Sequence, residues 1–288
     1  MRNRKIFFSI LGGIFALAII LSVIILHSRD EVLRVIFLDV GQGDAILISQ
    51  GSQQVLIDGG KDGKLLLEKL GKYIPFWDRK IENIIETHPD QDHIGGLVEV
   101  LQTYEVESVL ETKMQSDSQT FKKLEEIIAK NKVEKVEAKK DVSLKFSNGA
   151  TLQILYPFDS VMDVNGKDTN MYSVLAKLIV GENKFLLTGD LPTTQENELL
   201  SGDIDVSAQF LKVAHHGSKY ATSNEFLDKV KPTEAIISVG KNNSYGHPNP
   251  ETLQRLTAHR INIHRTDESG DLVYECFQLT NKCVLKAL

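Results

Sequence analysis

Short apolar runs rich in β-branched residues alternate along most of the chain with segments whose apolar residues recur every three or four positions. The first pattern is typical of strands and the second of amphipathic helices. The expected strands are residues 33–38, 45–49, 55–57, 81–86, 142–146, 151–155, 173–180, 184–188, 208–214, 235–239, 261–264 and 272–277. The expected helices are residues 64–73, 95–104, 121–130, 193–200, 224–230 and 250–258.

The strand runs fall into two groups, and each group begins with consecutive strands. This order predicts a layered α/β sandwich of two sheets with helices on the outside. Two hairpins are expected, with turns at residues 147–149 and 181–183. Because no repeat or linker-like stretch divides this part of the sequence, residues 30–288 are expected to form one domain.

Residues 6–26 have a different pattern, with 21 consecutive residues that carry no charge. A helix of this length would measure about 31 Å, which is close to the thickness of the hydrocarbon core of a bilayer. Basic residues precede the run, so the positive-inside rule places the N-terminus in the cytoplasm. We therefore expect residues 1–29 to form a cytoplasmic tip and one transmembrane anchor, with the following domain outside the cell membrane. A cleaved signal peptide is the alternative, although Ala16-Leu17-Ala18 lies in the middle of the run.

Composition and charge limit the function classes. The chain is 42% hydrophobic and 25% charged, which excludes disordered, collagen-like and disulfide-rich proteins. Residues 1–29 hold four of the 33 basic residues and no acidic one, so the remainder has 29 basic against 39 acidic residues, a net charge of −10. An acidic body argues against binding long nucleic acid through bulk charge. It leaves open a local metal site that handles phosphate.

Cys276 and Cys283 are too few for a cysteine-rich zinc site. Outside the cell they could pair, because both lie in a third apparent hairpin, whose turn could include Thr280-Asn281. Two unpaired thiols are the alternative, because antiparallel partners must lie nearly opposite each other.

Five of the eight histidines fall in short clusters that also hold Asp, Gly or Pro. The richest cluster, residues 87–96, directly follows an expected strand and places four candidate ligands within six residues: His88, Asp90, Asp92 and His93. Such spacing requires a loop, because a helix or a strand would scatter these side chains. Imidazole nitrogen and carboxylate oxygen are the ligands of hydrolytic divalent metals, so the cluster predicts a metal site.

Further candidates lie at the ends of other expected strands or, for His247, in the polar cluster Ser244–Pro248. Asp190 could bridge two metal ions. His215 and His216 are adjacent, and neighbouring residues of an extended chain face opposite sides, so we expect one of them to bind metal and the other to contact substrate. His247 could protonate a leaving group or hydrogen-bond a phosphate. Asp58 is expected to orient a metal ligand.

The order Asp58, His88-x-Asp90-x-Asp92-His93, Asp190 and His215-His216 resembles the metallo-β-lactamase superfamily. The segments Phe37–Asp44, His215–Ser218 and Tyr245–Pro248 resemble more closely the extracytoplasmic hydrolase domain of ComEC-type competence proteins. The resemblance covers about residues 33–273. It implies an αββα sandwich, here preceded by one transmembrane helix, with a two-metal site along one edge of the sheets. It also implies ester hydrolysis, which in the competence branch is the degradation of one DNA strand during uptake.

Three departures from the family pattern matter. Asp90 stands where the superfamily usually has histidine, although the competence branch often has Asp there. No histidine lies between His93 and His215, and Asn170 is near the place of the missing ligand. The third departure is the lack of the multi-helix membrane channel of full competence proteins, and a single anchor helix is not expected to move DNA itself.

The resemblance implies two divalent ions, Mn²⁺ or Zn²⁺, which activate water and neutralise phosphate charge. His88, Asp90 and Asp190 would hold one ion, and Asp92, His93, Asp190 and one of His215 and His216 would hold the other. This oxygen-rich ligand set favours Mn²⁺ or Mg²⁺ relative to an all-histidine zinc site. Asp92 and His247 are the expected catalytic residues. The residues expected to support ligands or contact substrate are Asp44, Asp58, Asn170 and Ser218.

The leading hypothesis is a membrane-anchored, extracytoplasmic phosphodiesterase or DNase that contacts the membrane through its N-terminal helix. A hydrolase of small-molecule or cell-wall phosphoesters is one alternative, and the acidic body favours it. A non-catalytic accessory subunit that kept the fold is the other.

Overall fold

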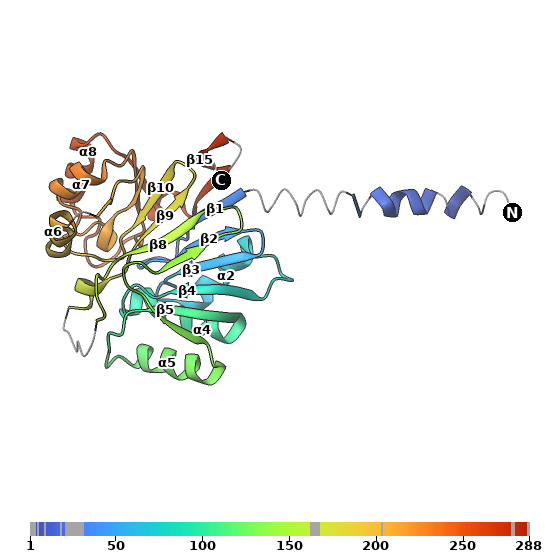
Figure 1. Ribbon diagram of the computed structural model, residues 1–288, viewed down its shortest axis with the longest axis horizontal. Coiled ribbons are helices and arrows are strands. Elements are labelled where there is room, and N and C mark those ends of the chain that lie inside the picture. The colour runs from blue at the N-terminus through green and yellow to red at the C-terminus, as the bar shows by residue number, and fades with distance from the viewer. Residues whose placement is uncertain are drawn as a thin grey trace.

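Two β-sheets packed face to face form the body of the molecule, and helices cover the outer face of each sheet (Figure 1). This computed structural model describes residues 4, 6–8, 10–17, 19–20, 32–161, 168–202, 204–277 and 280–286. One apolar cluster lies between the two sheets, and two others lie between each sheet and its helices. The layered α/β sandwich expected from the sequence is therefore confirmed.

The first sheet has, within the described residues, eight strands in the order β15-β14-β1-β2-β3-β4-β5-β6. Their bounds are β1 Val32–Phe37, β2 Ile46–Gln50, β3 Gln53–Ile57, β4 Lys80–Ile85, β5 Glu105–Glu111, β6 Glu134–Glu137, β14 Leu272–Phe277 and β15 Lys282–Leu285. Strands β3 to β6 are parallel, and β1 runs in the same direction because β2 is antiparallel to both β1 and β3. These five strands therefore begin at one edge, the amino edge, and end at the opposite carboxyl edge.

The second sheet has seven described strands in the order β13-β12-β11-β10-β9-β8-β7. Their bounds are β7 Ser143–Lys145, β8 Thr151–Tyr156, β9 Leu175–Val180, β10 Asn183–Leu187, β11 Phe210–Lys212, β12 Glu234–Ile237 and β13 Asn262–Arg265. Both expected hairpins are present, as β7–β8 and β9–β10, and strands β10 to β13 are parallel.

The six expected helices are present with ends shifted by no more than two residues. Helices α2 (Gly63–Tyr73), α4 (Leu97–Thr103) and α5 (Gln119–Asn131) pack on the first sheet, and α6 (Thr193–Ser201), α7 (Asn224–Val230) and α8 (Pro250–Ala258) on the second. Short turns complete the chain: α3 (Gln91–Ile94), η1 (Thr169–Tyr172), η2 (Ala214–Gly217) and α9 (Thr266–Ser269). The side chains of Asp62 and Ser118 cap the first turns of α2 and α5, which explains where these two helices begin.

Two strands, β5 and β6, were not expected from the sequence, and β15 was expected only as the second arm of the hairpin that holds the two cysteines. In β5 the exposed positions are Glu105 and Glu107, and β6 has a glutamate at each end, Glu134 and Glu137. The strand expected over residues 208–214 is shorter than predicted, because the chain turns into η2 at Ala214. This difference changes the interpretation of the histidines that follow.

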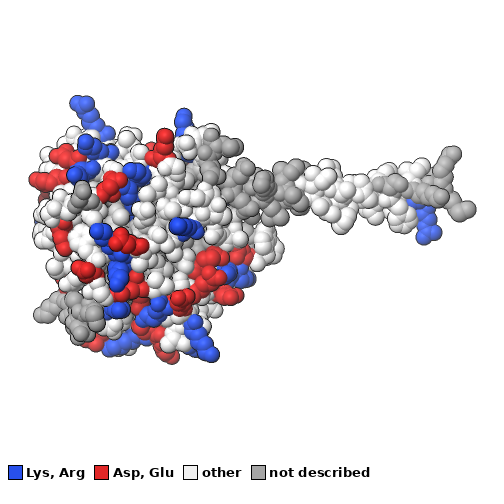
Figure 2. Space-filling view, viewed as in Figure 1, with Lys and Arg blue, Asp and Glu red and all other residues white. Residues whose placement is uncertain are grey.

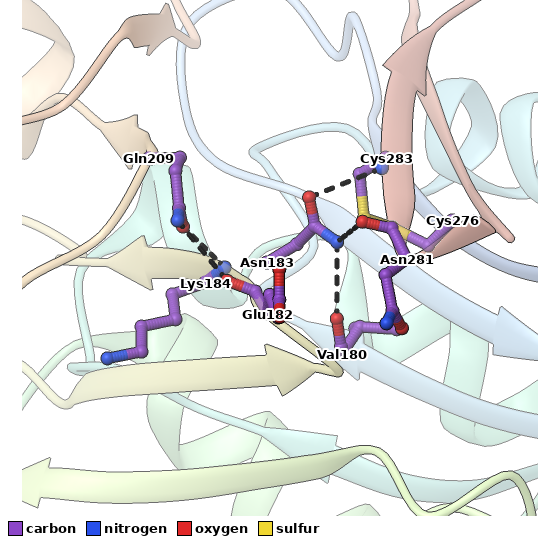
Figure 3. Close-up of a disulfide and its surroundings, with 8 residues drawn as sticks. All are labelled: Val180, Glu182, Asn183, Lys184, Gln209, Cys276, Asn281 and Cys283. Carbon is purple, nitrogen blue, oxygen red and sulfur yellow. Dashed lines mark hydrogen bonds between the residues drawn. A yellow bond between two sulfur atoms is a disulfide. The ribbon is translucent and has the colours of Figure 1, made fainter. Parts of the chain in front are cut away.

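Cys276 and Cys283 lie opposite each other across β14 and β15 and form a disulfide (Figure 3). Of the two alternatives left open by the sequence, the structure has the bridge. The Asn183 amide ties this hairpin to the turn between β9 and β10, since its Nδ2 donates to the Asn281 carbonyl over 2.8 Å and its Oδ1 accepts from the Cys283 amide over 3.3 Å. The bridge therefore joins the outermost strand of the first sheet to its neighbour, and the Asn183 amide holds this hairpin beside the second sheet.

The expected membrane anchor, residues 6–26, lies only partly within the described residues, because residues 9, 18 and 21–26 are outside them. The described side chains of this segment are exposed, among them Phe7 and Phe15. Considering described residues only, no helix combines the length and the hydropathy that crossing a bilayer requires. The anchor and the boundary between residues 29 and 30 stay predictions.

Candidate metal centre

Polar loops from both sheets meet where the parallel strands end. Asp58 follows β3, the His88–His93 loop follows β4, Asp190 follows β10 and His216 follows β11. Parallel neighbours deliver their carboxyl ends to the same edge, and the packing of the two sheets brings the two sets of loops together. The candidates predicted from separate stretches of sequence therefore lie in one place.

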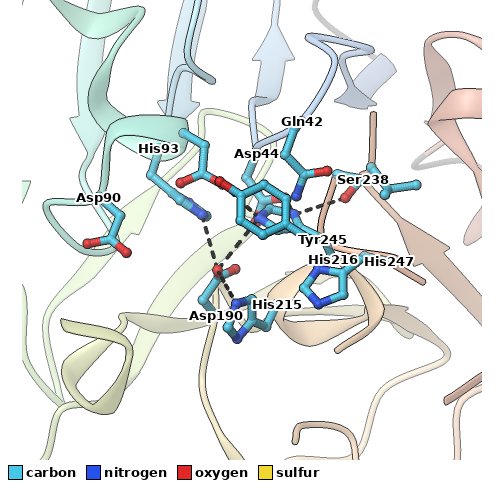
Figure 4. Close-up of polar contacts among 12 residues, drawn as sticks. Gln42, Asp44, Asp90, His93, Asp190, His215, His216, Ser238, Tyr245 and His247 are labelled. Carbon is cyan, nitrogen blue, oxygen red and sulfur yellow. Dashed lines mark hydrogen bonds and ion pairs between the residues drawn. The ribbon is translucent and has the colours of Figure 1, made fainter. Parts of the chain in front are cut away.

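Asp190 occupies the centre of this group (Figure 4). Its Oδ2 lies 3.4 Å from His93 Nε2, 3.6 Å from His216 Nε2, 3.8 Å from His215 Nε2 and 4.0 Å from His88 Nε2. Gly189 precedes it and has φ +49°. A Cβ at this position would clash with the Ser173 hydroxyl, which accepts a hydrogen bond from the Asp190 amide. A glycine is thus required to aim this carboxylate.

Several buried atoms of the group have no hydrogen-bond partner among the described residues. They are His88 Nε2, His93 Nε2, His216 Nε2 and Asp190 Oδ1. Leaving such atoms unpaired costs about 1–3 kcal/mol each, so a folded chain seldom collects them without a ligand. Four groups of candidate ligand atoms have all their members within 4.8 Å of one another: His88, His93 and Asp190; Asp92, His93 and His216; Asp44, Asp58 and His93; Asp44, Asp190 and His216. The donor set fits divalent metal ions.

Asp58 fixes the tautomers of two of these histidines. It is fully buried and accepts from the Thr87 amide over 2.9 Å, the Thr87 hydroxyl over 2.7 Å and His93 Nδ1 over 2.8 Å. Because the Thr87 hydroxyl donates to Asp58, its oxygen accepts from His88 Nδ1 over 2.9 Å. Both rings then carry their proton on Nδ1 and present the Nε2 lone pair to the centre. Thr87 was not singled out in the sequence.

His216 is held in the same way from the second sheet. Its Nδ1 donates to the Ser238 carbonyl over 2.9 Å and lies 3.4 Å from Asp44 Oδ1. Asp44 is buried and forms an ion pair with the buried Lys212, whose ammonium also donates to the Gly189 carbonyl over 3.3 Å. Lys212 therefore compensates the charge of a carboxylate that would otherwise be buried beside other carboxylates.

Asp90 and Asp92 lie on opposite sides of the centre. Asp90 Oδ2 is 3.8 Å from His88 Nε2, and its Oδ1 accepts from the Thr169 hydroxyl over 2.6 Å. Asp92 Oδ2 is 3.4 Å from His216 Nε2. Asp90 therefore lies beside His88 and Asp92 beside His216, as the two expected ligand sets require. Asp90 is, however, in none of the four close groups.

His215 and His216 correct one premise of the sequence interpretation. They lie in η2 with φ 51° and 53°, not in an extended strand, so they do not face opposite sides. Both Nε2 atoms approach Asp190, and the two residues differ in burial: His216 is buried, whereas the side chain of His215 is 31% exposed. His216 belongs to two of the close groups, while His215 lies on the open side, 3.4 Å from the Asn170 amide.

Ser218 and two helix residues shape the loop after η2. The Ser218 amide donates to the His215 carbonyl over 2.8 Å, so this serine closes the turn. The buried Glu196 carboxylate of α6 accepts from the Thr222 and Ser223 amides, and the Arg255 guanidinium of α8 donates to the Thr222 carbonyl over 2.9 Å. Glu196 and Arg255 carried no signal in the sequence beyond one charge each on an amphipathic helix.

When no cation is bound, the carboxylates and imidazoles of the centre shift one another's pKa values. Burial lowers the pKa of His216, but Asp190 and Asp44 raise it to about 9. Burial also lowers the pKa of His93, and Asp190 with Asp58 raises it well above its usual range. Burial raises the pKa of Asp190, and His216 with His93 lowers it well below the usual value. The metal-free centre therefore holds protons where cations would bind.

We expect metal affinity to rise with pH. Cations bind deprotonated imidazole, so below pH about 9 they must displace the proton of His216. Each proton released raises the apparent affinity about tenfold per pH unit, which is about 100-fold per proton between pH about 6 and about 8. Calorimetric titration with Mn²⁺ in two buffers of different ionisation enthalpy counts the protons released. An affinity that does not change over this range would contradict the expected coupling.

The sequence is similar to a known protein family and to several curated proteins. A family model described as the metallo-beta-lactamase superfamily matches residues 38–123. ComE operon protein 3 of Bacillus subtilis (strain 168) is 33% identical over 271 residues, which cover 86% of this chain and 33% of that protein. Recombination protein 2 of Haemophilus influenzae is 28% identical over 287 residues, which cover 96% of this chain and 33% of that protein. The chain spans about a third of the length of these curated relatives.

Solved structures agree on the fold. The metallo-beta-lactamase fold protein YhfI from Bacillus subtilis has a TM-score of 0.55 at 14% identity, covering 84% of this chain and 99% of that one. CmlA, a diiron beta-hydroxylase from Streptomyces venezuelae, has a TM-score of 0.51 at 13% identity, covering 81% of this chain and 52% of that one. At such identities the similarity concerns the fold alone.

Proposed function

The chain is a metallo-β-lactamase-fold protein related to competence proteins, and from this premise we propose that it is a metal-dependent phosphodiesterase that accepts DNA. The observation that carries the proposal is the position of Asp190, whose Oδ2 lies within 4.0 Å of four imidazole Nε2 atoms. A carboxylate so placed can serve two ligand sets at once. His88 with Asp90 would form one set, and Asp92, His93 and His216 would form the other.

Bound divalent ions would supply an activated water and neutralise charge on the phosphate. The protein's own contribution is to hold the ligands in advance. Asp58 and Thr87 orient His88 and His93, and the Ser238 carbonyl orients His216, so little reorganisation is needed when cations bind. Carboxylates supply much of the ligand set, which favours Mn²⁺ over Zn²⁺.

Of the two roles expected for His247, we propose the hydrogen bond to a phosphate rather than the protonation of a leaving group. Its ring lies 5.4 Å from that of His215, and its Nδ1 is buried with no hydrogen-bond partner among the described residues. Burial, together with His215 and His216, lowers the pKa of His247 to about 4. Near neutral pH the ring is therefore uncharged, and one of its nitrogens can donate to a phosphate oxygen.

Replacing His247 with alanine should slow turnover by about 10²- to 10³-fold and leave the metal content unchanged, as expected for the loss of one donor to developing charge. His247→Gln keeps an N–H donor and should lose less. Turnover rates on a model phosphodiester and metal analysis of both variants test this. Equal losses in the two variants, or loss of metal from His247→Ala, would remove the assigned role.

An open groove of about 630 Å³ continues from His247 and is lined in part by Lys241, Asn243 and Arg265. Asp267 and Glu268 line it too, and both carboxylates pair with the Arg265 guanidinium. The Lys241 ammonium can hydrogen-bond phosphate oxygens along a nucleic-acid backbone. The Asn243 amide already donates to the Gly240 and His247 carbonyls, so it shapes the groove. On the face shown in Figure 2, acidic and basic side chains are interspersed over the body. Support for a DNA substrate therefore comes from this groove beside the centre and not from bulk charge.

Two alternatives are separated by one set of assays. A small-molecule or cell-wall phosphoester hydrolase would cleave bis(p-nitrophenyl) phosphate but neither single-stranded nor duplex DNA. An accessory subunit would bind no metal, or bind it without hydrolysis. The fold alone does not decide, since one protein of similar fold is a diiron beta-hydroxylase. We expect the metal-loaded protein to cleave the model diester and DNA, and failure to cleave either form of DNA would refute the proposal.

The membrane location is part of the same proposal. Support comes from the uncharged run of residues 6–26 with Arg2, Arg4 and Lys5 before it. The Cys276–Cys283 bridge adds to it, because disulfides persist mainly in oxidising compartments outside the cytoplasm. Protease added to intact cells should digest the domain. Protection of the domain, with cleavage only near the N-terminus, would reverse the orientation.

A further inference from the structure

Phe76 and Trp77 project from the loop between α2 and β4. Phe76 is 81% exposed and Trp77 is 64% exposed, and their rings meet edge to face with centroids 4.9 Å apart. Exposed large aromatic side chains that adjoin each other mark interaction surfaces more often than isolated apolar residues do. The metal centre makes no use of this pair.

The pair lies at the amino edge of the first sheet, at the opposite end of the strands from the metal centre. Trp77 comes shortly before β4, which begins at Lys80, whereas the ligand loop follows the other end of β4. Strand β1 runs in the same direction as β4 and begins at Val32, so the N-terminal chain enters at this same edge. Three strand spacings of about 4.8 Å separate β1 from β4, or about 14 Å.

The chain between the uncharged run and the domain is short. Residues 27–31 join residue 26 to Val32, and at no more than about 3.6 Å per residue they span about 20 Å at most. This step rests on the anchor of the proposed function. If residues 6–26 cross the bilayer, the amino edge is held within about 20 Å of the membrane surface.

We propose that Phe76 and Trp77 insert into the lipid headgroup region and seat the domain on the bilayer. Tryptophan is enriched at this depth, because its ring is apolar and its N–H can still reach water or a headgroup. The exposed Lys72 and Arg79 flank the pair and can reach lipid phosphates, although Lys72 also lies 3.9 Å from Glu68. The domain is then attached at two points and its carboxyl edge faces away from the membrane.

The test uses Trp77 as its own probe, since the chain has one tryptophan. The full chain is reconstituted in phosphatidylcholine vesicles with and without brominated acyl chains. We expect Trp77 emission to shift to shorter wavelength and to be quenched by the brominated lipid, and Phe76→Ser to reduce both effects. The matched control carries Trp77→Phe and Tyr220→Trp, which moves the probe to an exposed site beyond η2, where emission should be unaffected by bromine.

Flotation of the same vesicles separates this proposal from the one it rests on. Chain that floats with the vesicles while Trp77 stays unquenched would overturn the lipid contact and leave the anchor standing. Chain that does not float would overturn both. Equal quenching of the tryptophan at position 77 and at position 220 would also overturn the seating, because the two probes lie at opposite edges.

Discussion

Replacing Asp190 with asparagine is expected to reduce phosphodiester hydrolysis by about 10³-fold and to lower the bound metal. Its Oδ2 approaches four imidazole nitrogens, and asparagine keeps the size of the side chain but removes its charge. A metal ion contributes several kcal/mol to stabilising transition-state charge, and each 1.4 kcal/mol is a factor of ten in rate. The backbone contact to Ser173 does not depend on the side chain, so the loop should keep its conformation.

Metal stoichiometry and turnover of purified Asp190→Asn check this expectation. The matched control is Asp62→Asn, because Asp62 caps α2 and asparagine is an equally good cap. The control should keep its metal and its rate. Full activity of Asp190→Asn, with unchanged metal content, would leave the fold without the proposed chemistry.

The second large effect is expected for His93→Ala. The substitution removes one buried Nε2 ligand and also one of the three groups that donate to Asp58. We expect loss of about one metal ion per chain and a fall in rate nearly as large as for Asp190→Asn. A buried carboxylate that loses a partner costs about 1–3 kcal/mol, so the metal-free variant should also unfold at lower denaturant concentration.

Two further measurements make this result specific. His259→Ala removes a histidine that lies at the end of α8, so it should change neither the metal content nor the rate. Added imidazole should restore part of the metal and activity of His93→Ala if the loss is that of a ligand. A variant that keeps both ions and the full rate would exclude His93 from the ligand set.

Hydrophobic periodicity was sufficient for most of the fold but not for its charged strands. The ends of α7 and α8 agree with the expected residues, because their apolar positions are flanked by Ser223 and Pro250, which favour the start of a helix. Strand β6 reads Glu-Lys-Val-Glu and offers no such pattern. The pairing of Cys276 with Cys283 stayed open because it depends on register, which the sequence does not specify at this turn.

At the site, the candidate metal ligands could be found from the sequence, but the groups that orient them by hydrogen bonds could not. His88, His93, Asp190 and His216 stand out because several metal-binding residue types follow the ends of strands. The groups that hydrogen-bond these ligands carry no such signal. The Ser238 carbonyl belongs to the backbone, and the Thr87 hydroxyl is a common side chain next to the histidine cluster. The conformation of η2 could not be inferred, since positive φ at two consecutive histidines is rare and is imposed by surrounding structure.

The outermost strands of both sheets are short and polar. Each of β6, β7, β13 and β15 has four residues or fewer, and each carries at least one Lys, Arg or Glu. Unpaired backbone groups at a sheet border can recruit strands from another molecule, and short charged borders suppress such pairing. The glutamates that hide β6 from sequence-based prediction are also the charges that disfavour pairing at this border, so we expect their replacement with valine to promote fibrous self-association.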